Sequence, residues 1–528
     1  MPQTERRVAL RVLQAGAIAV VLSAAPYKTF DLDRFFVPKE LAVSITALIV
    51  TLLCLARAKR LSLGRADQLL ALWLLLGVVS AVFATNWWLA GRAVAVSLAG
   101  AACFWCARTL SRAGYARALV AALALAGVVG AVTALLQAYG VKTDLFSLNR
   151  APGGTFGNRN FMAHLCVITL PALLFSGMRA PTRESLARWC GGLALVSGAL
   201  ILSRSRAAWL ALVVGVIVLL VTGIIALRRR DGSLKPMRVV VLLVAAGAGA
   251  AAALVIPNTL DWKSDSPYAD TAHSIVNYKG GSGHGRLIQY GNSLKMTLRH
   301  PLLGVGPGNW PVIYPKFASE NDPSLGQEGM TSNPWPSSDW VTFLSERGPF
   351  ALALIGLAVL ALLADGMRGL RDGADTETRF TAAVFLATLV VLLIVGAFDA
   401  VLLLPIGALV GWSLLGALAP PSRERSAIEL TLPRRLIAFV FVAAVGGLIV
   451  ARSSAQLLAM SIYATSSKAS SLERASTIDP GSYRIHARLA QLYLGRGDCK
   501  RSKVHAKAAT LQFPSSPTAR RLLASCGG

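Results

Sequence analysis

The sequence predicts an all-α, polytopic membrane protein with about 12 or 13 transmembrane helices. Three observations carry this prediction. The chain of 528 residues is 54% hydrophobic and only 15% charged, and its mean hydropathy is +0.56. Apolar stretches long enough to cross a bilayer recur along it. The basic residues stand in short clusters between those stretches, so the net charge of +27 indicates membrane topology rather than a nucleic-acid surface.

One transmembrane helix is expected at each apolar stretch. The first stretch follows the basic segment MPQTERR and lacks a small-residue cleavage site, so we expect a retained helix rather than a signal peptide. The chain then divides into an N-terminal transmembrane bundle (1–256), a large loop (257–340), C-terminal transmembrane helices (341–455) and a tail (456–528). The expected spans are 9–25, 41–56, 67–84, 91–107, 118–138, 161–178, 189–203, 207–227, 238–256, 341–364, 379–397, 400–418 and 435–453.

Alternate loops between the spans are basic, and this pattern predicts the orientation of the chain. Loops rich in Lys and Arg stay in the cytoplasm, so the N-terminus is expected there. The large loop and the tail are then expected on the opposite, extracytoplasmic side. The six basic loops are 57–65, 108–117, 179–188, 228–238, 368–379 and 422–435.

The seven cysteines do not form a metal-binding pattern. Cys103 and Cys106 are spaced as a CxxC pair, but they lie in an apolar stretch without a second pair, which indicates core packing. Cys499 and Cys526 stand in the tail and would form a disulfide only if that compartment is oxidising. Neither a cofactor nor a metal is expected.

The tail carries a weak internal period. ASTIDP ends at Pro480 and AATLQFP ends at Pro514, 34 residues later, which is the period of a tetratricopeptide repeat. Only about one and a half repeats fit, so the last transmembrane helix would have to cover them. Two interpretations remain, a helical cap on the outer face or a docking surface for a partner protein or glycan.

Two arginines stand at a point where the chain turns between two spans. LSRSRAAWLAL places Arg204 and Arg206 in this minimal turn. Either both side chains reach the lipid headgroups, or one of them binds an anion such as a lipid phosphate, for which the guanidinium fork is suited. Residues two apart on a helix point in different directions, so only one is expected to face a given site.

The large loop contains a helix followed by a glycine-rich turn. The spacing predicts a helix from Arg286 to Arg299, and GVGPG then interrupts it. The glycines do not form a dinucleotide fingerprint, because no strand precedes them and a proline interrupts them. We expect a tight turn that lets the loop pack against the membrane domain. One apolar stripe of the predicted helix consists of Leu287, Tyr290, Leu294 and Leu298.

The segment GGTFGNRNFMAHLCVITLPALL (153–174) opens another transmembrane helix. Asn158 is suited to cap this helix, and Asn160 lies in its first turn. The unpaired N–H groups and the positive end of the helix dipole suit a phosphate group. The alternative is that the asparagines only cap the helix.

Taken together, four stretches resemble the O-antigen ligase and O-antigen polymerase superfamily of bacterial envelope glycosyltransferases. They are GTFGNRNFMAHL, SRSRAAWL, GRLIQY followed by RHPLLGVGPGNWPVIYP, and SSDWVTFLSERG, and they occur in the family's order within about residues 70–420. HPLLGVGPGN is the most specific. The resemblance implies a fold of the C-type glycosyltransferase kind in the bacterial inner membrane, with the large loop and the tail in the periplasm.

The resemblance also implies the reaction. The donor would be a glycan on undecaprenyl diphosphate, and the acceptor would be a sugar hydroxyl, on lipid A core for a ligase or on another lipid-linked glycan for a polymerase. The transfer would invert the anomeric carbon without a metal. By motif, Arg206 and Arg286 match the family's arginines that hold the diphosphate and stabilise its charge as it leaves. Arg204 and Asn160 would be further contacts of the diphosphate.

The sequence departs from the family before the last motif. Ligases usually carry a His-Asn pair there, with the histidine proposed as the base or as a group that positions the acceptor, whereas this chain has Ser337 and Ser338. Asp339 is the nearest group that can accept the proton of the acceptor hydroxyl. The alternative is that Asp339 is a cap or first-turn acid of the next helix. His284 and His300 in the large loop are other candidates for the base.

Aromatic residues flank these serines. Trp335 and Trp340 are expected either to stack on sugar faces or to anchor the chain at the membrane interface. Ser337 and Tyr290 complete the expected contacts with the glycan or acceptor.

The missing histidine favours a polymerase, or an atypical ligase, in the synthesis of surface polysaccharide, either O-antigen or exopolysaccharide. A transporter of lipid-linked sugars is the rival interpretation, but transporters are usually built from internal repeats, and no convincing repeat relates the two halves of this chain. A third interpretation is a scaffold that recruits other envelope proteins through its tail.

Overall fold

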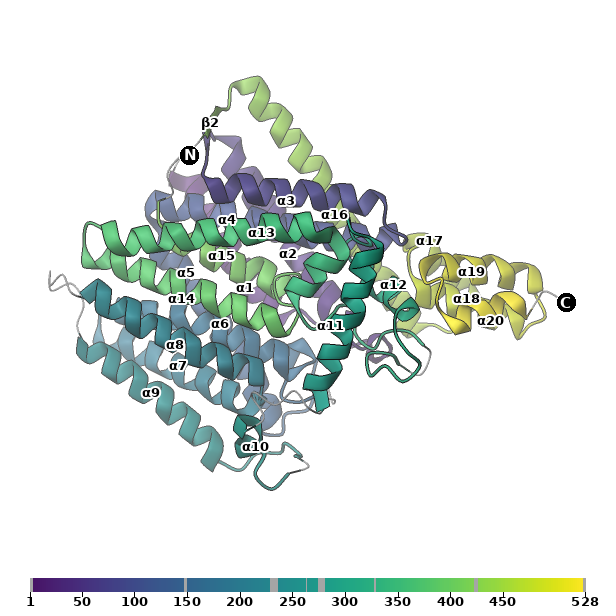
Figure 1. Cartoon of the computed structure of the whole chain (residues 1–528), viewed down its shortest axis with the longest axis horizontal. Coiled ribbons are helices and arrows are strands. Elements are labelled where there is room, and N and C mark those ends of the chain that lie inside the picture. Colours follow the sequence, from purple (N-terminus) through teal and green to yellow (C-terminus); the bar gives the residue numbers. More distant parts are fainter. Residues whose placement is uncertain are drawn as a thin grey trace.

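Long helices make up most of the chain (Figure 1). The structure is a computed structural model and describes residues 3–146, 150–227, 236–262, 264–273, 281–326, 329–421 and 426–525. Within these residues, ten helices are long and apolar enough to cross a membrane. The protein is therefore a multi-pass, all-α membrane protein, as the sequence predicts.

The membrane-spanning helices follow the predicted order. One of the ten, which runs from residue 87 to residue 138, is divided at Gly114, whose positive φ of 90° lets the chain reverse. The spanning helices are α2 (Asp33–Ala56), α3 (Arg65–Val82), α4 (Trp87–Leu110), α5 (Ala116–Ala138), α6 (Arg159–Met178), α7 (Arg183–Ser203), α8 (Arg206–Leu227), α9 (Pro236–Val255), α13 (Asp339–Asp372), α14 (Thr376–Phe398) and α16 (Leu432–Thr465). The first helix of the bundle is α1 (Gln3–Leu22).

The predicted span 400–418 is only partly helical, which corrects the sequence prediction. The helix occupies Gly407–Leu418, as η5 (Gly407–Gly411) and α15 (Trp412–Leu418), and residues 399–406 form a non-helical segment before it. A helix of this length rises about 18 Å, which is less than the bilayer core of about 30 Å. The element is therefore a half-helix surrounded by the bundle.

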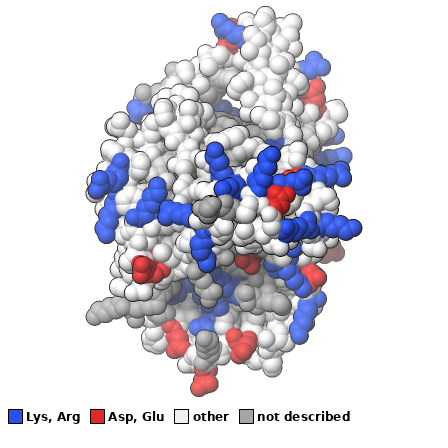
Figure 2. Space-filling view, turned by 90° about the vertical axis from the view of Figure 1, so that its right-hand side faces the viewer, with Lys and Arg blue, Asp and Glu red and all other residues white. Residues whose placement is uncertain are grey.

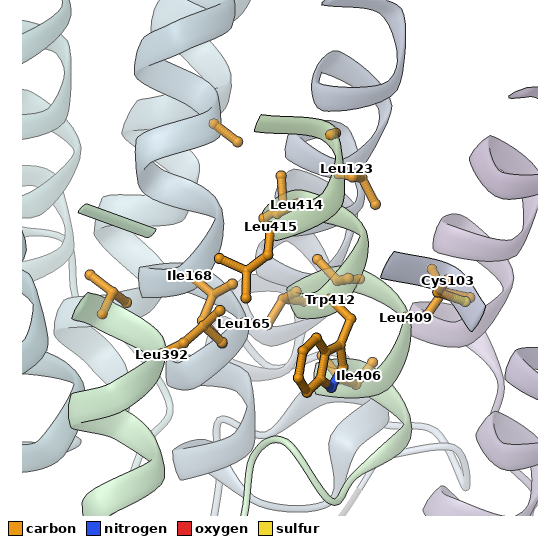
Figure 3. Close-up of a cluster of buried hydrophobic side chains, with 14 of the residues drawn as sticks. Cys103, Leu123, Leu165, Ile168, Leu392, Ile406, Leu409, Trp412, Leu414 and Leu415 are labelled. Atoms are coloured by element: carbon orange, nitrogen blue, oxygen red, sulfur yellow. The ribbon is translucent and has the colours of Figure 1, made fainter. Parts of the chain in front are cut away.

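The half-helix packs in the hydrophobic core of the bundle, where all of its residues are buried (Figure 3). Trp412 meets Phe104 of α4 edge to face, with ring centroids 6.0 Å apart. Figure 3 shows leucine and isoleucine side chains of α5, α6 and α14 around the same helix. Because the half-helix is buried on all sides, its apolar residues are not confined to one face, and its sequence shows no helical period of polar and apolar residues.

The basic loops meet at one end of the bundle, here called the basic end. Strand β1 (Arg60–Leu63) pairs in antiparallel fashion with β2 (Ser426–Glu429), which joins the first and last of these loops. Arg117 and Arg179 both donate to the carboxylate of Glu377, with Nε to Oε1 distances of 3.2 Å. Arg238 donates to the carbonyl of Met178. The described parts of the six basic loops thus lie at the same end of the bundle, as the predicted topology requires.

The large loop covers the opposite end, here called the loop end (Figure 1). Its helix α11 (Gly281–Arg299) confirms the predicted helix. The leucines of the predicted apolar stripe are exposed, however, with Leu298 at 71%, while Gln289 and Ser293 on another face are buried. The remaining elements of this end are η1 (Lys28–Phe30), η3 (Gly154–Phe156), α10 (Pro267–His273), α12 (Trp310–Ile313) and η4 (Tyr314–Lys316).

The glycine-rich turn packs against the membrane domain, as predicted, and does so at a break in α13. Gly304, Gly306 and Gly308 have positive φ angles of 67°, 97° and 69°. The carboxylate of Glu346 accepts the backbone N–H groups of Gly308 (2.7 Å) and Trp310 (3.1 Å). Glu346 therefore holds the turn in place through two charge-assisted hydrogen bonds.

The tail is a set of short helices docked on the loop end. The end of α16 packs on α17 (Ala469–Ile478) and α18 (Tyr483–Leu494), so this helix covers the tail's core as expected. Helices α19 (Cys499–Gln512) and α20 (Pro517–Ala524) complete it. The side chain of Asn86 donates to the carbonyl of Gln512, which ties the tail to α4. Cys499 is disulfide-bonded, and its expected partner Cys526 lies outside the described residues.

Candidate functional site

Basic side chains outnumber acidic ones on the face of the molecule that carries the tail (Figure 2). Four arginines of the loop end, here called the arginine cluster, are Arg150, Arg159, Arg204 and Arg286. Arg159 lies within electrostatic range of Arg150 and Arg204, and both Arg150 and Arg286 lie within range of Asp399. The cluster therefore combines several guanidinium groups with one buried carboxylate, an arrangement suited to a polyanion.

The turn between α7 and α8 positions one of these arginines. Arg204 takes the left-handed conformation, with a φ of 52°, and ends α7. Its guanidinium lies 4.6 Å from the ring centroid of Trp262 and donates from Nε to the hydroxyl of Thr271 at 2.9 Å. Arg206 begins α8 and is half-buried. The contacts of Arg204 thus hold the start of the large loop close to the spanning helices.

The first turn of α6 positions a second arginine. Asn158 caps this helix by accepting the backbone N–H of Asn160 at 3.0 Å, which confirms the predicted cap. Arg159 follows the cap and lies 4.9 Å from the ring of Trp262. Trp262 therefore has a cation–π contact with Arg159 as well as with Arg204.

Asp399 is a carboxylate that the sequence analysis did not single out. It directly follows α14 and is 8% exposed, and its Oδ1 accepts the backbone N–H of Ala400 at 2.9 Å. Burial raises the pKa of Asp399 to about 6, although the charges of Arg286 and Arg150 oppose this shift. The signal in the sequence was a lone acid between two apolar stretches, GAFDAVLLLP.

Asp339 is fully buried and holds backbone groups. Its two carboxylate oxygens accept the N–H groups of Val401 (3.0 Å) and Leu402 (2.9 Å), in the non-helical segment before the half-helix. Backbone donors that are buried at membrane depth need such partners. This geometry favours the alternative anticipated from the sequence, a first-turn acid, over a base that reaches the acceptor hydroxyl. Ser338 is the residue that caps α13.

The two tryptophans have different surroundings. Trp335 is half-buried and meets Phe36 and Phe161 edge to face, with centroids 5.2 Å and 6.1 Å apart. Trp340 points into the bundle instead, where its indole N–H donates to the carbonyl of Leu393 at 3.3 Å. Trp335 thus stands beside the first turns of α6, near the arginine cluster, whereas Trp340 packs against α14.

Tyr290 and Ser337 form a clamp between α11 and the start of α13. The hydroxyl of Tyr290 donates to the carbonyl of Ser337 at 2.6 Å, and the amide of Ser337 donates to the side chain of Gln289 at 2.7 Å. These bonds keep α11, and with it Arg286, next to α13. His284 and His300, the other predicted candidates for the base, are exposed at the two ends of α11.

The charged pair of the SERG motif also has a structural role. Arg347 is 1% exposed, donates to the hydroxyl of Ser97 at 2.6 Å and lies 4.4 Å from the ring of Trp73. Its neighbour Glu346 holds the glycine-rich turn. Both side chains therefore join the large loop and α13 to the spanning helices.

Part of the chain matches a known protein family. Residues 191–356 match the family model described as O-antigen ligase. This region contains Arg204, Arg206, Arg286 and the large loop. None of the curated proteins compared with the chain matches it.

Proposed function

The chain belongs to the O-antigen ligase and O-antigen polymerase superfamily, and from this premise we propose that it is an inner-membrane glycosyltransferase of surface-polysaccharide synthesis. Its donor is a glycan carried by undecaprenyl diphosphate, and the transfer takes place at the periplasmic face. The observation that supports this proposal most is the arginine cluster at the loop end, partly within the matched region.

The arginines give the site its affinity for the donor. Guanidinium groups stay charged and match phosphate oxygens with their forked donors. Arg286 of the cluster and Arg206, which begins α8 two residues after Arg204, hold the diphosphate. Arg204 and Asn160 provide further contacts at its edge. As the bond between the anomeric carbon and the phosphate oxygen breaks, negative charge grows on the leaving diphosphate, and these cations stabilise it.

The acceptor hydroxyl attacks the anomeric carbon from the face opposite the diphosphate, so the configuration inverts. The hydroxyl loses its proton to a base, and the undecaprenyl diphosphate leaves. We propose Asp399 for this role in place of Asp339, because Asp399 lies within electrostatic range of Arg286, while both oxygens of Asp339 accept backbone N–H groups.

A polymerase is the preferred activity, because Ser337 and Ser338 stand where ligases usually carry a His-Asn pair. Transfer to lipid A core is the second candidate, and the description of the matching family as O-antigen ligase favours it. A carrier function for the same lipid-linked sugars is the more distant alternative. The tail would serve as a further contact for envelope proteins.

Reconstitution of the full chain with a defined lipid-linked oligosaccharide tests the proposal. Longer lipid-linked products indicate a polymerase, and product on added lipid A core indicates a ligase. R206A and R286A are expected to lower the transfer rate at least a hundredfold, and R286K less, because lysine keeps the charge but not the fork. R474A on the exposed face of α17 is the matched control.

Two results would contradict the proposal. One is wild-type protein that forms no glycosidic product but moves the donor across the bilayer. The other is R206A and R286A protein with wild-type rates. We also expect EDTA to leave the rate unchanged, since the arginines supply the positive charge that a divalent cation supplies in other transferases.

A further inference from the structure

His164 is a buried polar side chain without a hydrogen-bond partner. It lies on α6, about one and a half turns after the helix begins, and is 3% exposed. Neither Nδ1 nor Nε2 has a partner among the described residues. Buried polar atoms in native proteins are nearly always paired, so an imidazole with two unpaired nitrogens calls for a functional explanation.

The surroundings of His164 belong to the loop end. Its ring meets Phe161 at a centroid distance of 6.4 Å and an interplanar angle of 66°. Phe161 in turn packs against Trp335, one of the predicted glycan contacts. Arg286 lies within electrostatic range of His164 and also of Asp399. The imidazole therefore shares its corner of the bundle with a proposed phosphate-binding arginine and the proposed base.

The chemistry of imidazole restricts what can satisfy both nitrogens. A neutral imidazole carries one N–H donor and one acceptor nitrogen. Phosphate oxygens only accept hydrogen bonds, and guanidinium groups only donate them. A hydroxyl group both donates and accepts, and carbohydrates carry many of them. Among the groups of a lipid-linked glycan, a hydroxyl can therefore satisfy the imidazole, while the nearby Arg286 binds the phosphate.

We propose that His164 binds a carbohydrate hydroxyl next to the diphosphate, so that Arg286 recognises the phosphate and His164 recognises the sugar attached to it or the sugar that attacks it. This inference rests on the proposed function. His164 would then select the sugar from within the membrane helices, in addition to the aromatic side chain of Trp335, which packs on the neighbouring Phe161.

The test uses full-length protein in proteoliposomes with a defined undecaprenyl-diphosphate oligosaccharide and a defined acceptor. H164L removes both polar nitrogens and keeps an apolar side chain that the site can bury. H164N keeps one donor and one acceptor. S176A is the matched control, because Ser176 is a buried polar residue nearer the other end of α6 that bonds only to Ala172 of its own helix.

We expect H164L to lower kcat/KM at least tenfold with unchanged thermal stability, H164N to recover part of the loss, and S176A to match wild type. A rise in KM for the donor alone assigns the hydroxyl to the donor sugar. A rise in KM for the acceptor, or a fall in kcat, assigns it to the acceptor. Either result supports the proposal.

Wild-type kinetics for folded H164L, together with an inactive R286A, would overturn the role of His164 and leave the proposed function intact. If wild-type protein itself forms no product, the proposed function fails and the inference fails with it. If H164L does not fold, H164N and H164A take its place. A wild-type kcat/KM in H164N together with a reduced kcat/KM in H164A supports hydroxyl binding. A wild-type kcat/KM in both variants rejects it.

Discussion

The charged carboxylate of Asp399 is less stable in the folded protein than in water, because the side chain is buried. Its pKa is raised from 3.8 to about 6 because it is buried, so the folded state prefers the protonated acid. The stability that the protonated acid provides is complete below pH 4 and is lost as the pH rises through 6. The penalty above pH 6 is roughly 3 kcal/mol for a shift of about two pKa units.

Replacing this carboxylate should therefore stabilise the protein and inactivate it. We expect D399N to unfold at a higher temperature than wild type at pH 8 and at a similar temperature at pH 4, and to lose at least a hundredfold in transfer rate. Thermal unfolding in detergent at both pH values, with product formation measured on the same samples, checks this. A lower unfolding temperature of D399N at pH 8 would assign Asp399 a structural role.

The same residue predicts the pH dependence of transfer. A base must be deprotonated to act, so kcat/KM of wild type should rise about tenfold per pH unit below pH 6 and become constant above it. In D399N, kcat/KM should not rise with pH in this range. E184Q, which changes an exposed acid at the basic end, is the control and should keep the wild-type profile. A wild-type profile that stays flat between pH 5 and pH 7 would exclude Asp399 as the base.

Asp339 should behave in the opposite way. Its oxygens accept two backbone N–H groups, and an asparagine can accept only one of them and turns a donor toward the other. D339N should therefore lose about 1.5–3 kcal/mol of stability while the protein that remains folded keeps most of its transfer rate. Unfolding temperature and rate per folded molecule distinguish the two aspartates. Inactive but fully stable D339N would restore Asp339 as the base.

The sequence alone points to Asp339 and not to Asp399, and the reason is physical. Asp339 stands in a polar, aromatic segment that draws attention, but its partners Val401 and Leu402 lie more than 60 residues away and carry no side-chain signal. Asp399 is a single acid in an apolar run, and Arg286 comes within electrostatic range of it only because α11 meets the end of α14. Arg286 could be predicted from a motif, whereas the side chains that lie near it could be identified only from the folded structure.

At the scale of elements, the spanning helices could be predicted because the length of an apolar stretch is a direct measure of its ability to cross a bilayer. The segment 400–418 could not, because a buried turn and a buried half-helix are equally apolar. The glycine-rich turn was predictable, since three glycines in GVGPG indicate positive φ angles. The side of α11 that is buried was not, because its buried face is polar and bonds to the rest of the large loop.

The break in α13 is the element-level feature that joins the large loop to the membrane domain. Gly348 has a φ of 82°, and a Cβ at this position would lie 2.3 Å from the carbonyl oxygen of Leu302. G348A should therefore lower the stability by more than the usual mutational loss of about 1 kcal/mol and uncouple the loop from α13.

A matched substitution separates this effect from a general effect of alanine. Gly356 lies on the same helix, and a methyl group added there would have nothing within 4 Å, so G356A should be neutral or stabilising by up to about 1 kcal/mol. Unfolding temperatures and limited proteolysis of the large loop compare the two variants. Equal behaviour of G348A and G356A would mean that the break does not hold the loop.

At the scale of the whole molecule, the bundle carries the basic loops at one end and the large loop and the tail at the other. Glu5 of α1 bonds to Arg57 at the basic end, 3.3 Å away, so α1 starts at that end. The tail docks at the loop end through Asn86. The start of α1 and the tail therefore lie at opposite ends of the bundle, and the positive loops predict that the N-terminus is the cytoplasmic one.

Fusions to the full chain test this orientation. Green fluorescent protein is expected to fluoresce at the N-terminus and not after the tail, because it matures poorly when exported, and alkaline phosphatase after the tail is expected to be active because it needs the oxidising periplasm. The same phosphatase inserted between α13 and α14, at the basic end, should be inactive and serves as the internal control. The reverse pattern would put the arginine cluster in the cytoplasm, where it would meet lipid-linked donors before export, and the proposed periplasmic transfer would be wrong. Alkaline phosphatase that is active at both termini would instead contradict the arrangement of the helices, since a bundle with its termini at opposite ends allows only one of them to be exported.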